Sequence, residues 1–123
     1  MSHKILIVDD EPNIVVSLEY LLKKEGFEVA LAADGEEALA QVAAFAPDMV
    51  LLDVMMPKKS GFEVCQELRA DPAQAGLRIV MLTAKGRDTE MAKGLALGAD
   101  AYITKPFSTK ELVARVKSLL NMA

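Results

Sequence analysis

Short apolar segments alternate with segments of helical periodicity five times along this chain of 123 residues. The apolar segments cover residues 4–9, 27–32, 49–53, 79–83 and 101–104. They are almost continuously apolar, so each is expected to be a strand that is buried on both faces. The alternation predicts a single α/β domain, with a doubly wound five-stranded parallel sheet and helices on both of its faces.

Start and stop signals predict the helices between these strands. Pro12 suits the first turn of a helix that ends ahead of Gly26. Three later helices follow an Asp or Ser that has a Glu three residues on, at Asp34, Ser60 and Ser108. The helix expected over residues 88–97 contains Gly94, which costs about 1 kcal/mol relative to Ala. We therefore expect this helix to be comparatively mobile.

The composition limits the class of protein. Hydrophobic residues make up 52% of the chain and charged residues 26%, which is typical of one folded domain. The net charge of -4 argues against direct binding of nucleic acid, which needs a clustered basic surface. No apolar run approaches the roughly 18 residues of a membrane-spanning helix. The single cysteine, Cys65, allows no intramolecular disulfide, and we expect a cytoplasmic protein with Cys65 packed in the core.

Polar residues stand at the carboxyl ends of four predicted strands. Asp9 and Asp10 end the first, Asp53 the third and Thr83 the fourth, and the fifth leads into Lys105. Ligands of an open parallel sheet bind outside these ends. Singly, each residue has an ordinary explanation, such as a helix cap, a strand position or a surface charge. Because five such groups occur at successive strand ends, we expect them to form one site.

The residue types in this expected site indicate its chemistry. Three carboxylates repel one another, so the cluster should trap a proton or bind a cation. Oxygen ligands favour a hard cation such as Mg²⁺, and the absence of His and Cys from these motifs disfavours zinc. A lysine and a hydroxyl opposite the ion could hold the oxygens of a transferring phosphoryl group, with an Asp as the nucleophile.

Four segments together resemble a known family: I-L-I-V-D-D-E-P, L-L-D-V-M-M-P, M-L-T-A and T-K-P-F. With the L-A-L-G-A-D stretch, they make essentially the whole chain similar to receiver domains of two-component response regulators, of the single chemotaxis-regulator type. The resemblance implies a flavodoxin-like (βα)5 fold with strand order 2-1-3-4-5. It also implies that a sensor histidine kinase or a histidine phosphotransfer protein donates a phosphoryl group to the chain.

The same resemblance implies roles for individual residues. Asp53 would be the phosphoacceptor and a Mg²⁺ ligand. Asp10 would bind Mg²⁺ directly, Asp9 would act through water or an auxiliary contact, and the backbone carbonyl of Met55 would complete the protein ligands. Lys105 would contact the phosphoryl group, aimed into the site by a cis peptide bond to the following proline.

A switch is implied as well. Thr83 would move toward the bound phosphoryl group, and Tyr102 would turn inward, although Tyr102 could also be an ordinary half-buried strand residue. The signal would be read on the surface of the fourth helix, the fifth strand and the last helix by an unknown downstream protein or effector domain. Met55 and Lys85 flank the expected path of an attacking water, so we expect them to tune the lifetime of the phosphoryl group. Ser60 is a departure, because many receivers have Asp there.

Other functions remain as alternatives. A metal-dependent phosphohydrolase with an Asp nucleophile would need a general acid where Met55 stands. A receiver-like module that binds without phosphorylation is less favoured because all five site groups are present. A flavin or nucleotide carrier lacks its glycine-rich phosphate loop after the first strand. We expect no output domain, and we slightly favour a stand-alone receiver over one cut from a longer protein. We expect either a monomer or a phosphorylation-dependent dimer.

Overall fold

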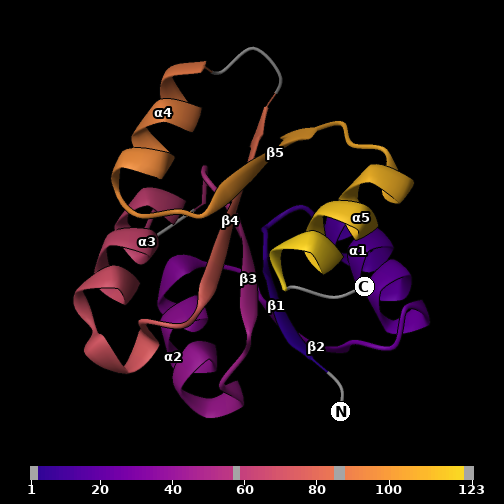
Figure 1. Cartoon of the computed structure of the whole chain (residues 1–123), viewed down its shortest axis with the longest axis horizontal. Coiled ribbons are helices and arrows are strands. Elements are labelled where there is room, and N and C mark those ends of the chain that lie inside the picture. Colours follow the sequence, from indigo (N-terminus) through magenta and orange to yellow (C-terminus); the bar gives the residue numbers. More distant parts are fainter. Residues whose placement is uncertain (1–2, 57–58, 85–87, 121–123) are drawn as a thin grey trace.

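The computed structural model describes residues 3–56, 59–84 and 88–120 of the chain. The described residues form one sheet of five parallel strands with helices between them (Figure 1). The strands are β1 (Lys4–Val8), β2 (Glu28–Ala32), β3 (Met49–Asp53), β4 (Arg78–Ala84) and β5 (Ala101–Lys105). The helices are α1 (Pro12–Lys24), α2 (Gly35–Phe45), α3 (Gly61–Ala70), the short 3-10 helix η1 (Pro72–Gln74), α4 (Asp88–Ala96) and α5 (Thr109–Leu119). The elements expected from the sequence are confirmed, with ends that differ by a residue or two.

The strands follow the order β2-β1-β3-β4-β5, as the resemblance implied. β1 pairs with β2 on one side and with β3 on the other, so the order of strand addition reverses between β1 and β3. A crevice opens at such a reversal because the connections leave the two strand ends toward opposite faces. The carboxyl ends of β1 and β3 therefore lie side by side where a ligand site is expected.

Helices cover both faces of the sheet, with α1 and α5 on one face and α2, α3 and α4 on the other (Figure 1). Neighbouring residues of β3 point to opposite faces: Met49 and Leu51 pack toward α1 and α5, and Val50 and Leu52 pack toward α2 and α3. Every residue of β3 is buried. The continuously apolar strands thus supply two core layers, and the expectation of a sheet covered on both faces is confirmed.

Local chemistry sets the helix ends. The Asp34 carboxylate accepts a hydrogen bond of 2.8 Å from the backbone N–H of Glu37, and Ser60 forms a reciprocal capping box with Glu63. Gly26 follows α1 with φ of 93°, a conformation that costs glycine nothing. Cys65 is fully buried on α3, as expected. None of the described helices has the length and the apolar character required to span a bilayer.

Gly94 has a packing role that its helix propensity does not reveal. It is buried on the face of α4 that lies against the sheet, where a Cβ atom would come within 3.1 Å of the Cγ of Met81 on β4. The missing side chain thus allows α4 to approach β4 closely. Glycine has a low helix propensity, but at this position it allows the helix to pack closer to the sheet.

Candidate functional site

The carboxyl ends of β1, β3, β4 and β5 surround a hollow of about 170 Å³. Its lining residues are Asp10, Glu11, Asp53, Val54, Met55, Leu82, Thr83, Ala84, Glu90 and Lys105. Asp53 is the last residue of β3, and Asp9 directly follows β1. Parallel strands bring both residues to the same edge of the sheet, as expected from their positions in the sequence.

Three carboxylates form an acidic cluster at this edge. Oxygen atoms of Asp9, Asp10 and Asp53 all lie within 4.8 Å of one another, with Asp9 and Asp53 buried and Asp10 exposed. Burial, together with the negative charge of Asp9, raises the pKa of Asp53 from 3.8 to about 6, although Lys105 and a hydrogen bond from the Met55 backbone lower it in part. It is therefore unfavourable for all three carboxylates to carry a negative charge at the same time. A donor set made only of oxygen fits a hard divalent cation, which would relieve the repulsion.

Lys105 brings a positive charge to the acidic cluster from the end of β5. Its Nζ lies 2.8 Å from Oδ2 of Asp9, 3.3 Å from Oε1 of Glu11 and 3.5 Å from Oδ1 of Asp53. Burial alone would lower the pKa of Lys105, but the hydrogen bond to Asp9 and the negative charges around it raise the pKa overall. The ammonium group is therefore held in its charged form. The peptide bond from Lys105 to Pro106 is cis, as the resemblance implied.

Thr83 supplies the hydroxyl of the site. It is buried near the end of β4, and its Oγ1 donates a hydrogen bond of 3.0 Å to the carbonyl oxygen of Ala84. The structure thus brings the five predicted groups to one edge of the sheet. Of the two residues expected to flank the water path, Met55 lines the hollow and is 70% exposed. Lys85 lies outside the described residues.

Gly61 and Glu11 are site residues that sequence reasoning missed. The N–H of Gly61 donates to the Val54 carbonyl oxygen at 2.9 Å, and a Cβ at position 61 would collide with the carbonyl oxygen of Asp53. Glycine is thus required where α3 begins against the end of β3. Glu11 was visible only as the residue after two aspartates, and nothing nearby in the sequence indicated its contact with Lys105.

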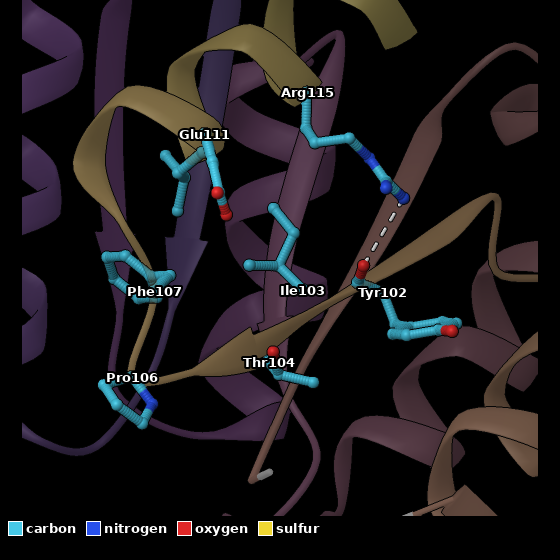
Figure 2. Close-up of a pocket in the computed structure, with 8 residues that line it drawn as sticks. Tyr102, Ile103, Thr104, Pro106, Phe107, Glu111 and Arg115 are labelled. Atoms are coloured by element: carbon cyan, nitrogen blue, oxygen red, sulfur yellow. Dashed lines mark hydrogen bonds between the residues drawn. The ribbon is translucent and has the colours of Figure 1, made fainter.

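Tyr102 lies on β5 next to a second hollow, of about 200 Å³, between β5 and α5 (Figure 2). Its ring points away from Ile103 and Phe107, and its backbone oxygen accepts a long hydrogen bond of 3.5 Å from Arg115. The ring is half-buried against the same core layer as Met81 on β4. Thr83 is two residues beyond Met81, so Thr83 and Tyr102 are directed to the same face of the sheet.

A sequence model described as the response regulator receiver domain matches residues 5–117. The chain belongs to the response regulator receiver domain family. This confirms the resemblance drawn from the four motifs and makes the chain a signalling domain of two-component systems. Receivers of this family bind Mg²⁺ in an acidic pocket and interact with histidine kinases or phosphotransfer proteins and with downstream effectors.

Individual relatives agree with this assignment of the receiver. The chain is 50% identical over 120 residues to the alkaline phosphatase synthesis transcriptional regulatory protein PhoP of Bacillus subtilis, which covers 98% of the chain and 49% of that protein. The receiver thus spans about half the length of this curated relative. The chemotaxis response regulator CheY4 of Vibrio cholerae has a TM-score of 0.91 at 33% identity, covering 97% of this chain and 99% of CheY4.

A further solved structure contains a metal ion. The receiver domain of the sensor histidine kinase PA1611 from Pseudomonas aeruginosa has a TM-score of 0.89 at 28% identity, covering 98% of this chain and 99% of that domain. That structure has a magnesium ion coordinated in its active site cleft. It is therefore a solved relative in which the cleft of the same fold holds the cation that suits the acidic cluster described above.

Proposed function

We propose that this receiver accepts a phosphoryl group on the carboxylate of Asp53, from a phosphohistidine on a sensor histidine kinase or a histidine phosphotransfer protein. One observation carries the proposal: the Asp53 carboxylate lies at the end of β3 within 3.5 Å of the Lys105 ammonium. An acidic cluster alone could bind a cation. The lysine beside it adds a group that can offset the charge of phosphoryl oxygens.

In the transfer, an oxygen of Asp53 attacks the phosphorus atom in line with the bond to the donor imidazole. That P–N bond breaks, its electron pair stays with the imidazole, and Asp53 becomes an acyl phosphate. Lys105 binds the phosphoryl oxygens, and the Thr83 hydroxyl contacts them after turning from the Ala84 carbonyl. Water later attacks the phosphorus, which releases phosphate and restores the Asp53 carboxylate.

Mg²⁺ is the cofactor that best fits this site. Asp10 and Asp53 would bind it directly, the Met55 backbone carbonyl would be the third protein ligand, and Asp9 would act through water. The oxygen-only donor set and the acidic cluster support this assignment, as does the magnesium ion in the PA1611 receiver. When bound, the ion supplies positive charge that offsets the charge on the transferring phosphoryl group.

Residues 1–123 would act as one receiver domain in the cytoplasm, and α4, β5 and α5 would form its output surface. The shared orientation of Thr83 and Tyr102 supports a switch in which both side chains move when Asp53 is modified. This output surface would bind a downstream protein or an effector domain. The receiver would act as a monomer or as a phosphorylation-dependent dimer. Met55 and Lys85 would tune hydrolysis, and unchanged phosphoryl lifetime after both are replaced by Ala would refute that role.

Intact mass after incubation with a small acyl-phosphate donor tests the proposal. The wild-type chain should gain the mass of one phosphoryl group when Mg²⁺ is present, and it should lose this ability when the metal is chelated. Asp53→Asn should gain nothing under either condition. Equal modification of Asp53→Asn and the wild type would show that another residue is the acceptor.

A further inference from the structure

The hydrogen-bonding capacity of Lys105 is the starting point. A lysine ammonium has three N–H donors. Three carboxylates surround it: Asp9 at 2.8 Å, Glu11 at 3.3 Å and Asp53 at 3.5 Å. The ammonium donates hydrogen bonds to Asp9 and Glu11 and forms an ion pair with Asp53. A phosphoryl oxygen that binds Lys105 therefore competes with these carboxylates for the ammonium.

Glu11 differs from the other two carboxylates in its surroundings. Its side chain is 60% exposed, whereas the side chain of Asp9 is 0% exposed and that of Asp53 is 9% exposed. Water can therefore solvate Glu11 when it leaves Lys105, but releasing Asp9 would leave a buried charge unpaired. Glu11 is consequently the partner that Lys105 can exchange at the lowest cost.

The backbone fixes Glu11 in a position to reach Lys105. Glu11 occupies the N-cap of α1, but its side chain makes no capping hydrogen bond. Its backbone N–H donates instead to Oδ1 of Asp9 at 2.9 Å, while Oδ2 of the same carboxylate accepts from Lys105. The residue that begins α1 is thus attached to the acidic cluster, and its side chain is directed to the ammonium.

We propose that Glu11 is a positioning residue that holds the Lys105 ammonium at the mouth of the site and releases it when a phosphoryl group binds. This inference rests on the proposed function and goes beyond it. Glu11 competes with the phosphoryl group for one N–H of Lys105. Removing its charge should therefore strengthen the binding of a phosphoryl group or of a tetrahedral mimic at Asp53.

Beryllium trifluoride, a tetrahedral phosphoryl mimic, tests the competition by calorimetry at saturating Mg²⁺. Glu11→Gln should bind it about two- to fivefold more tightly than the wild type, the range expected from an exposed ion pair. Glu37→Gln is the matched control. Glu37 is exposed and lines the neighbouring groove beside Asp10, so its replacement removes the same charge close to the site. The control should give a smaller change, which high salt abolishes.

The outcomes distinguish local competition for Lys105 from the general electrostatic effect of removing one negative charge near the site. A tighter affinity in Glu11→Gln that exceeds that of Glu37→Gln at the same salt concentration supports the inference. Equal changes in the two variants, or unchanged or weaker binding in Glu11→Gln, overturn it. If the wild type neither binds beryllium trifluoride nor becomes phosphorylated, the proposed function itself fails. The inference about Glu11 then falls with it.

Discussion

At the scale of single residues, Asp53 is kept in an environment that disfavours its charge. Its pKa rises from 3.8 to about 6 because the carboxyl is buried beside Asp9, and Lys105 compensates only in part. A folded state with the higher carboxyl pKa binds more protons than the unfolded state between these two values. Ionisation of Asp53 therefore destabilises the folded chain increasingly as the pH rises from about 4 through 6. This destabilisation is fully present at neutral pH.

Asp53→Asn should thus be more stable than the wild type at pH 7.5 without metal. A pKa change from 3.8 to about 6 corresponds to about 3 kcal/mol, which is an upper limit for the gain. Urea unfolding at pH 7.5 and at pH 4.5 measures the difference, which should shrink at the lower pH because wild-type Asp53 is then protonated. Mg²⁺ at pH 7.5 should also shrink it. A difference that grows toward low pH would contradict the assigned cause.

At the scale of the elements, the end of α2 contains a strained backbone. Ala46 caps this helix with φ of 52°, in the left-handed region that costs a residue with a Cβ about 1–2 kcal/mol. Ala46→Gly should therefore stabilise the receiver by about 0.5–1 kcal/mol, since part of the gain is lost to the flexibility of glycine in the unfolded chain.

Urea unfolding also tests this prediction, with Ala75→Gly as the control. Ala75 is exposed and ends η1 with φ of -60°, so glycine there relieves no strain and should destabilise the chain. Equal effects of the two substitutions on the free energy of unfolding would show that relief of backbone strain at Ala46 does not stabilise the receiver.

The elements also show what the sequence could reveal. Helix starts at Asp34, Ser60 and Ser108 were predictable because each cap joins residues three apart, and apolar runs identified the strands. Long-range pairs were not predictable in this way. Arg69 binds the carbonyl oxygens of Leu77 and Gly98 and the carboxylate of Asp100, and neither local periodicity nor capping chemistry indicates such partners.

At the scale of the whole molecule, the site depends on strand order. Asp9 and Lys105 are 96 residues apart, yet the parallel sheet brings both to the same edge. Sequence reasoning found the five groups because parallel strands end at one edge, a rule that requires no side-chain detail. It missed Glu11 because its contact with Lys105 depends on how the start of α1 turns back onto Asp9.

The same convergence predicts that Mg²⁺ stabilises the fold. Unfolding separates Asp53 from the adjacent Asp9 and Asp10, so the ion should bind the folded chain much more tightly than the unfolded chain. At a free concentration ten times its Kd, mass action contributes about 1.4 kcal/mol, which should raise the unfolding temperature by several degrees. Asp10→Asn is a suitable test because Asp10 is exposed and its replacement leaves the core untouched. This variant should unfold near the metal-free wild-type temperature at that Mg²⁺ concentration, and an undiminished rise would mean that the ion binds elsewhere.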